Sequence, residues 1–342
     1  MKHKKNSILK QPFTAHKRHR TGGFSIIELM VAMAIALILL LGLTVMFINA
    51  TGNFRELSNT SRQLENGRYA LNFVREDLRH AGFYGEWILG NAPNNFLDAC
   101  NITGNALNDL RATITGLYIQ GYSEAASNIP TCLVNHLPGT DALLVLRAST
   151  SIDGLNGDTT NLNSDTIYLQ TLHDIFVLAR GSQATNFNLE RDPSGLPAPH
   201  IRRVLAHLYY IRTCNICNDG GDGIPTLVRR ELDINGNITT VPLAEGIEQL
   251  YLRYGVDENG NGNPENYLAA AHADLSDPAD WQSIVAVEVN LLARSPDPSR
   301  NYVDQRSYTL GDLNIPATND EFKRQPFTSV VRMENIGQRR DQ

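Results

Sequence analysis

The sequence lacks the motifs that mark common enzyme classes. Its 342 residues include nine histidines, but these form no His-Glu-x-x-His pair, and there is neither a phosphate-binding P-loop nor a Gly-x-Ser-x-Gly turn. His207 lies within an alternating strand pattern, where a histidine is more often packed or at the surface than catalytic. We therefore expect a protein that is not an enzyme and that uses no cofactor.

Basic charge is scarce beyond residue 23. Seven of the 30 lysines and arginines lie in residues 1–23, which carry no acid, so residues 24–342 hold 23 basic against 36 acidic side chains. A body this acidic is not expected to carry the broad basic surface that binds nucleic acid. No nucleic-acid partner is expected.

Long apolar runs are absent, with one exception. The stretch from Leu29 to Ile48 contains no charged side chain, and as a helix it would span about 30 Å, the hydrocarbon thickness of a bilayer. A cleaved signal peptide has a shorter apolar region, of about 7–15 residues. We expect a single-pass membrane helix at residues 29–48, with basic residues 1–23 in the cytoplasm and residues 50–342 beyond the membrane.

The junction before this run carries a recognisable motif. Gly22-Gly23-Phe24 precedes Glu28, which would be the fifth residue of a chain that begins at Phe24. The motif resembles the processing site of type IV prepilins. The resemblance implies that a prepilin peptidase cuts between Gly23 and Phe24, that Phe24 is then N-methylated, and that residues 1–23 are a leader. A cut after Gly22 is the alternative, but it would not put Glu28 in fifth place.

Glu28 has a physical role in this interpretation. A carboxylate beside an apolar helix is costly in lipid, and inside a fibre it is tolerated only when an opposite charge pairs with it. The resemblance implies that Glu28 meets the N-terminal amine of an adjacent subunit. We therefore predict that Glu28 acts in assembly.

The helical pattern continues beyond the membrane run to residue 82. Leu57, Leu64, Leu71 and Leu78 recur at every seventh residue. Together with the residues three positions after each of them, they make a narrow apolar stripe; these residues are Thr60, Gly67, Val74 and Ala81. Such a stripe could form a zipper with another chain, but the residues three positions further on would make a poor second seam. We expect residues 24–82 to form one long helix whose amphipathic half packs on the chain's own sheet.

Residues 83–342 have the features of an antiparallel β-rich domain. Apolar side chains alternate in short runs that Gly, Asn, Asp and Pro separate. The predicted strands include residues 141–149, 165–172, 203–212, 226–232, 250–254 and 285–292. The expected fold class is α+β and type IV pilin-like, with a long N-terminal helix packed on a large antiparallel β-rich C-terminal domain.

Two segments resemble the PilW-type minor pilins. Residues 65–85 follow that family's pattern from Glu-Asn-x-Arg to Ala-Gly-Phe-x-Gly, and residues 245–295 follow its order of helical turn, strand, acidic turn, tryptophan and long strand. Glu86 and Trp87 stand where relatives commonly have a cysteine. The resemblance implies a protein that assembles with other minor pilins and the major pilin, primes the pilus and lies near its tip.

Four cysteines lie in the predicted exported body: Cys100, Cys132, Cys214 and Cys217. An even count in an oxidising compartment favours disulfides, with three possible connectivities. Cys100–Cys132 and Cys214–Cys217 are favoured on proximity in sequence alone. A redox dithiol or a zinc ligand pair at Cys214 and Cys217 is the alternative, but this segment follows a strand pattern and does not start a helix.

Residues 257–265 begin like a calcium loop. Asp257, Asn259 and Asn261 have the required spacing, but Leu268 stands where the bidentate acid belongs. We interpret the segment as a solvated hairpin turn, with weak Ca²⁺ binding by these three residues as the alternative. No other metal site is expected.

Three other functions share parts of this pattern. A J-type minor pseudopilin of type II secretion would have the same processing and helix, and a pilus-tip adhesin would bind a ligand through the β-rich domain. A membrane-anchored periplasmic enzyme or sensor is disfavoured by Glu28 and by the missing catalytic motifs. The favoured interpretation is a minor pilin that waits in the inner membrane, with its body in the periplasm, and then enters the pilus.

Overall fold

The computed structural model describes most of the chain. The described residues are 23–87, 90, 95–100, 107, 110–111, 116–154, 158–191, 198–233 and 237–336. Apart from Gly23, the predicted leader lies outside them. The chain divides into two compact units between Arg55 and Glu56.

One long helix begins the described chain. Helix α1 runs from Ile26 to Arg79, and within the described residues it is the one helix long and apolar enough to cross a membrane. The chain turns away shortly after it, at Gly82, whose φ of +70° is in the left-handed region that glycine adopts readily.

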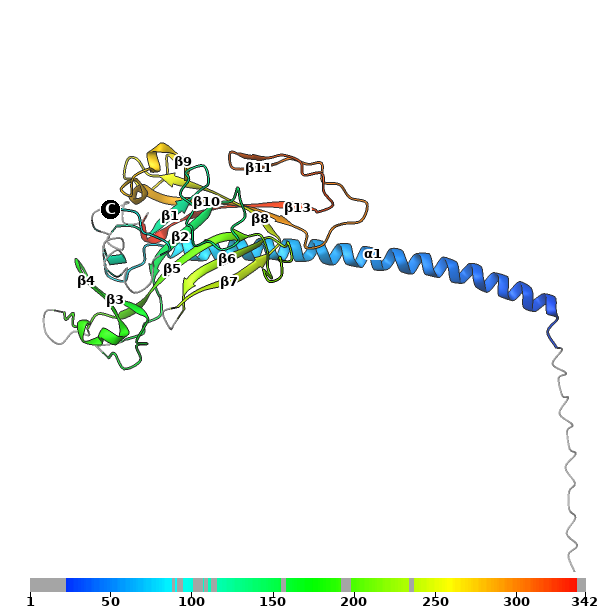
Figure 1. Cartoon of the computed structure of the whole chain (residues 1–342), viewed down its shortest axis with the longest axis horizontal. Helices are drawn as coiled ribbons and strands as arrows, with labels where there is room; N and C mark the ends of the chain where they lie inside the picture. The colour runs from blue at the N-terminus through cyan, green and yellow to red at the C-terminus, as the bar shows by residue number, and fades with distance from the viewer. Residues whose placement is uncertain are drawn as a thin grey trace, which may run out of the picture. The chain divides into compact units, whose positions relative to one another are not determined.

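The body consists of antiparallel strands in three sheets (Figure 1). A seven-stranded sheet has the order β1-β2-β5-β3-β4, with β6 paired to β5 and β7 to β6; a four-stranded sheet has the order β13-β10-β8-β9; and β11 pairs with β12. The strands are β1 (Ile119–Tyr122), β2 (Ala142–Ala148), β3 (Ile167–Leu172), β4 (Ile175–Arg180), β5 (Ile201–Arg212), β6 (Thr226–Leu232), β7 (Ile238–Glu245), β8 (Ile247–Val256), β9 (Asn266–Ala269), β10 (Ile284–Arg294), β11 (Tyr308–Leu310), β12 (Leu313–Ile315) and β13 (Arg324–Arg332). Three 3₁₀ helices lie among them: η2 (Gly181–Asn186), η3 (Ala273–Leu275) and η4 (Asp280–Ser283).

The predicted fold class is confirmed. The segments predicted as strands correspond to β2, β3, β5, β6, β8 and β10, and the second half of α1 packs on the body. Apolar side chains of these strands face a buried core, and β2, β3 and β10 are buried along almost their whole length. That core contains large side chains such as Tyr84, Tyr209 and Trp281.

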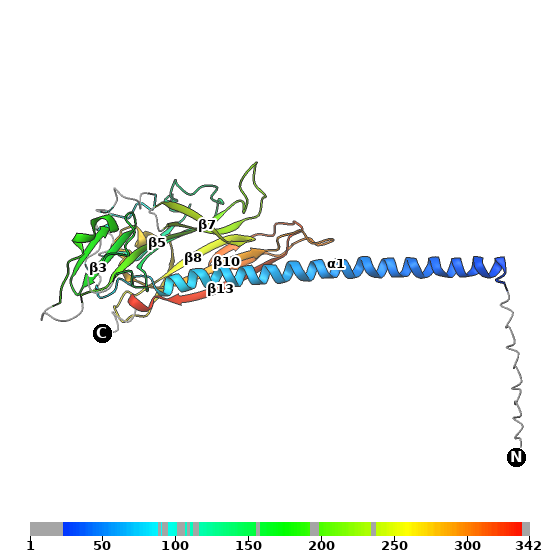
Figure 2. The same cartoon turned by 90° about the horizontal axis from the view of Figure 1, so that it is seen from below.

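The face that α1 buries agrees in part with the predicted stripe. Leu57 is 67% exposed and Leu64 is 37% exposed, so these two leucines do not form the seam, whereas Leu78 is fully buried. The buried helix residues are Gln63, Gly67, Ala70, Val74, Asp77 and Leu78. Small side chains at Gly67 and Ala70 let the helix come close to the sheet. Figure 2 shows this part of α1 running beside β13 and β10.

The closest approach is at Gly67. A Cβ atom at this position would lie 2.2 Å from Cε2 of Phe327 on β13, well inside van der Waals contact. Four residues earlier, the Gln63 amide donates to Ala293 O at 2.7 Å and to Lys323 O at 2.9 Å, so one side chain holds the ends of β10 and β13. At this end of the contact, helix docking thus depends on a missing side chain and on the polar anchor Gln63.

Replacing Gly67 by leucine is expected to loosen this docking. The new side chain must displace Phe327, and overpacking of this kind costs about 1–3 kcal/mol of unfolding free energy. Urea unfolding of the full chain in detergent would measure the loss. Gly52→Leu is the matched control, because Gly52 lies in the same helix with open space around its Cβ position. Equal effects of the two changes would contradict the proposed close approach.

Candidate functional site

The predicted processing site lies at the start of α1. Gly23 and Phe24 are exposed, and the Phe24 side chain is 89% exposed. Glu28 lies in the first helical turn, where a negative charge interacts favourably with the helix dipole. Phe24 and Glu28 therefore occupy adjacent parts of one short segment.

Glu28 also closes a hydrogen-bonded cap. The backbone N–H of Ser25 donates to Glu28 Oε2 at 3.1 Å, and the N–H of Ile27 donates to Ser25 Oγ at 3.4 Å. This is the reciprocal arrangement of a capping box, in which a serine and a glutamate three residues later satisfy N–H groups at the helix start. The Ser-x-x-Glu spacing is visible in the sequence, so this local role could have been predicted.

The apolar run that follows has no cover in the described chain. Its large side chains, from Leu29 to Ile48, are each more than half exposed. Contiguous apolar surface on this scale marks contact with a membrane or with other proteins. The segment can therefore serve as an anchor, as an assembly surface, or as both in turn.

Both candidate disulfides are present. Cys100 pairs with Cys132, with Cα atoms 5.5 Å apart, and Cys214 pairs with Cys217 at 5.2 Å. These are the pairs that proximity in sequence favours. The second disulfide lies in the loop between β5 and β6, not at the start of a helix.

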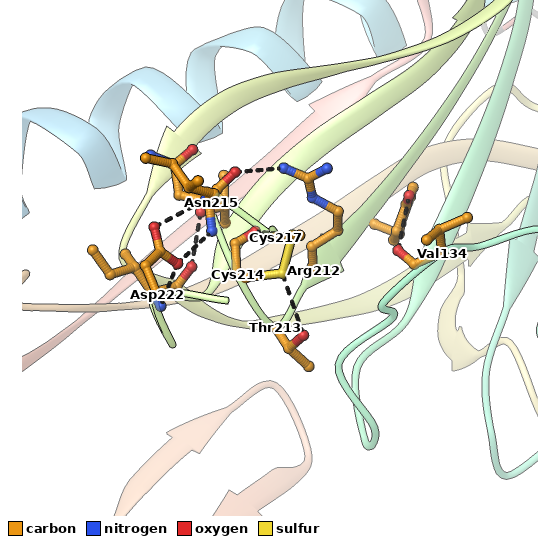
Figure 3. Close-up of a disulfide and its surroundings, with 11 residues drawn as sticks. Val134, Arg212, Thr213, Cys214, Asn215, Cys217 and Asp222 are labelled. Carbon is orange, nitrogen blue, oxygen red and sulfur yellow. Dashed lines mark hydrogen bonds between the residues drawn. A yellow bond between two sulfur atoms is a disulfide. The ribbon is translucent and has the colours of Figure 1, made fainter. Parts of the chain in front are cut away.

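Figure 3 shows how the Cys214–Cys217 loop is held. The carboxylate of Asp222 accepts the backbone N–H groups of Asn215 and Ile216, each at 2.9 Å, and that of Ile224 at 3.1 Å. The guanidinium of Arg212 donates to Asn215 O at 2.8 Å. Slight burial raises the pKa of Asp222, but the N–H donors outweigh it and lower the pKa overall. The arrangement is that of a structural loop.

The calcium candidate has the form of a self-contained turn. The Asp257 carboxylate is buried and accepts the N–H groups of Gly260, Asn261 and Gly262 at 2.7–3.1 Å. The side chain of Asn259 accepts the N–H of Asn261 at 2.9 Å. Within the described residues, no group of three or more His, Cys, Asp or Glu side chains is placed to hold a metal ion. Weak calcium binding stays a prediction.

A buried polar cluster joins α1 to the seven-stranded sheet. Asp77 accepts a hydrogen bond from Arg147 Nε at 2.6 Å and from the Tyr209 hydroxyl at 2.9 Å, and its Oδ2 lies 2.7 Å from His207 Nδ1. The other ring nitrogen of His207 lies 3.3 Å from Glu231. Burial raises the pKa of Asp77, but His207 and Arg147 outweigh it and hold the pKa well below its ordinary value. His207 is therefore packed, as its strand position predicted.

A second buried cluster centres on Arg324 at the start of β13. Its guanidinium contacts three carboxylates: Glu248 at 2.6 Å, Asp320 at 2.6 Å and Asp304 at 3.3 Å. Arg324 and Asp304 are almost fully buried. Burial lowers the pKa of Arg324, but the carboxylates outweigh it and raise the pKa. The cluster fixes the last strand to β8 and to the loop before it.

Sequence reasoning missed these polar residues for a common reason. Asp77, Gln63 and Arg324 look like ordinary surface residues. The partners of Asp77 and Gln63 lie far away in the chain, as does Glu248, one of the partners of Arg324. One signal was available, because Gln63 and Asp77 fall on the side of the helix that also carries Gly67 and Ala70. Polar side chains on such a small-residue face suggest anchors to a partner surface.

Two segments of the chain match known families. Residues 208–335 match PilW, the Type IV Pilus-assembly protein W family. Residues 18–44 match the prokaryotic N-terminal methylation motif, and this range contains Gly23, Phe24 and Glu28. No curated protein matches the sequence.

A similar solved structure is the type IV-like pilin TTHA1219 from Thermus thermophilus. The two chains are 9% identical, the match covers 80% of this chain and 97% of the other, and the TM-score is 0.36.

The two family matches concern separate parts of the molecule and agree. One covers the start of α1, and the other extends from within β5 to the turn after β13. With its apolar helix and its disulfide-bonded β-rich body, the chain is similar to the PilW-type minor pilins of the type IV pilus over residues 208–335, and its N-terminal segment matches the prepilin methylation motif.

Proposed function

We propose that the chain is made as a prepilin, cut by prepilin peptidase between Gly23 and Phe24, N-methylated at Phe24 and assembled with other minor pilins and the major pilin. The observation that carries this proposal is the motif itself, in which Gly23-Phe24 precedes Glu28 and an uncharged run to Ile48. The exposure of Phe24 supports it, because a peptidase must reach the bond.

The apolar run from Leu29 to Ile48 lies in the membrane before assembly and among the helices of other subunits after it. Before assembly the apolar run crosses the inner membrane, with the basic leader in the cytoplasm and residues 83–342 in the periplasm. After assembly the same side chains pack against the helices of other subunits. Their exposure supports both stages, because each stage covers surface that the chain itself leaves open.

The role of the complex is to prime the pilus, with this subunit near the tip. A body of residues 83–342 is bulky for a subunit that repeats along a fibre, and this favours a terminal position. The work is mechanical and interfacial. It needs no catalysis, no cofactor and no nucleic acid.

Glu28 supplies the charge that selects the partner. Once buried among apolar helices, its carboxylate must find an opposite charge, since leaving a buried charge unpaired costs several kcal/mol. The N-terminal amine of a neighbouring subunit meets this need and fixes the register between the two helices.

Two substitutions at Glu28 separate this role from the local cap. Glu28→Ala removes the charge and the cap, whereas Glu28→Gln removes the charge and keeps an N3 side chain that suits a capping box. We expect both variants to be cut normally, with a mature N-terminus at Phe24 by mass spectrometry, and both to lose most surface pili. Glu65→Ala, an exposed acid further along α1, should leave piliation unchanged.

Two outcomes would contradict the proposal. Wild-type piliation of Glu28→Gln would assign Glu28 to helix capping alone. A mature chain that still starts at Met1 in piliated cells would refute the processing step.

A further inference from the structure

Asp141 is a buried acid at the junction of the two large sheets. It directly precedes β2 in the seven-stranded sheet, and its side chain is 5% exposed. Its backbone N–H donates to Leu250 O on β8 at 2.9 Å, and the N–H of Leu252 donates back to Asp141 Oδ2 at 2.9 Å. One residue thus makes two hydrogen bonds from the seven-stranded to the four-stranded sheet.

On one side of β8, hydrogen bonds from the segment before β2 take the place of pairing with another strand. β9 pairs with β8 only from Arg253 to Val256, so the earlier part of β8 needs other partners on that side. Asp141 supplies them, and the Gln249 amide adds a bond to Gly139 O at 2.9 Å. The contact between the sheets therefore depends on the segment that ends at Asp141.

The groups that face the Asp141 carboxylate are neutral. From β8, Tyr251 and Tyr254 are close enough for its charge to raise their pKa values. From the loop after β1, the Ser123 side chain forms a hydrogen bond with it. The hydroxyl of Tyr254 is buried without a hydrogen-bond partner in the described part of the chain.

The nearest titratable groups along the chain do not neutralise Asp141. The ring of His136 is bound to Thr140, and Glu124 lies near His136. None of the ion pairs among the described residues includes Asp141, whereas Asp77 and Asp304 each have an arginine partner.

A buried carboxylate without a cation favours its protonated form. Burial raises the pKa of Asp141 to about 7, although the Leu252 N–H and Ser123 lower it in part. The folded state thus holds a proton that the unfolded chain releases near its ordinary pKa of 3.8. This contribution to stability is fully present below pH 3.8 and is lost as the pH rises through about 7.

We propose that Asp141 makes the junction between the two sheets a proton-controlled clamp, which holds the body more tightly as its surroundings become more acidic. The neutral acid still accepts the bond from Leu252, and the junction then holds no buried, unpaired charge. The device concerns the stability of the body and does not depend on the proposed role in pilus assembly.

The test compares wild type with Asp141→Asn, which mimics the neutral acid at every pH. Urea unfolding of the full chain in detergent gives the unfolding constant of each at pH 5, 6, 7 and 8. Between pH 5 and 7, the wild-type constant should rise about tenfold per pH unit relative to that of Asp141→Asn. At all four pH values the variant should be the more stable protein, by a margin that stops growing above about pH 7.

Asp274→Asn is the matched control, because the Asp274 side chain is 73% exposed and should follow the wild-type profile. Parallel profiles of wild type and Asp141→Asn would overturn the proposal. If Asp141→Asn fails to fold, hydrogen exchange of wild-type residues 249–254 decides instead. Protection that does not increase from pH 8 to pH 5, after correction for the intrinsic pH dependence, would overturn it equally.

Discussion

Replacing Asp77 by alanine is expected to cost the body about 3–5 kcal/mol of unfolding free energy, the usual loss when one partner of a buried ion pair is removed. The change leaves the Arg147 guanidinium and the Tyr209 hydroxyl without their acceptor, and His207 loses the carboxylate beside Nδ1. Since a domain of this kind is stable by about 5–15 kcal/mol, the variant should be near the limit of folding.

The measurement is urea unfolding of the full chain in detergent, with Glu76→Ala as control. Glu76 is the neighbouring residue on α1, its side chain is 64% exposed, and its one ion pair among the described residues is a 3.8 Å contact with His80. We expect this control to change stability by less than about 0.5 kcal/mol. Similar losses for the two variants would show that the buried cluster does not hold the helix.

The pH dependence of Asp77 gives a second observation. Because its folded pKa lies below the ordinary value of 3.8, its contribution to stability is present above pH 3.8 and is lost as the pH falls further. Asp77→Asn keeps an acceptor oxygen for Tyr209, but its side chain is neutral at every pH and takes up no proton on acidification. Its unfolding free energy should therefore fall less steeply than that of wild type below pH 3.8.

Arg324→Met should produce a loss of similar size, about 3–5 kcal/mol. Methionine keeps much of the side-chain volume, but Glu248, Asp304 and Asp320 then lie close together without their shared cation. Arg324 also lowers the pKa of Asp320 to about 2, so that pKa should return toward its ordinary range in the variant. Arg306 remains beside Asp304 and limits the damage there.

Hydrogen exchange of Arg324→Met would locate the loss of stability within the body. Protection should fall in β13 and in the adjoining part of β8, whereas β3 and β4 should retain theirs because they belong to the other large sheet. Arg300→Met, at an exposed position in the loop between β10 and β11, is the control. A uniform loss over all strands would instead indicate that the body unfolds as one unit.

Local patterns in the sequence predicted the motif, the membrane run and the strands. Gly23, Phe24 and Glu28 are neighbours in the chain, and strand alternation depends only on which residues face the core. The seam of α1 was predicted only in part, because it depends on the opposing surface: Leu78 is buried as expected, but Leu57 and Leu64 are exposed. Phe327 selects Gly67 as the point of contact, and no local signal in the helix contains that information.

The partners of the polar anchors were beyond prediction for the same reason. Asp77 and His207 are separated by 130 residues, and Gln63 and Lys323 by 260. From sequence, each looks like a solvated side chain. Asp141 is similar, because its burial results from β9 ending where it does and leaving an edge of β8 for another segment to cover.

The contact between Gly67 and Phe327 sets an order of events during synthesis. α1 emerges from the ribosome first and β13 last among the strands, yet β13 supplies Phe327, and Lys323 just before it accepts from Gln63. A nascent chain cannot complete docking at Gly67 until nearly all of the body has been made, although Asp77 can meet Arg147 and Tyr209 earlier. Until then the small-residue side of the helix around Gly67 lacks the strand that covers it.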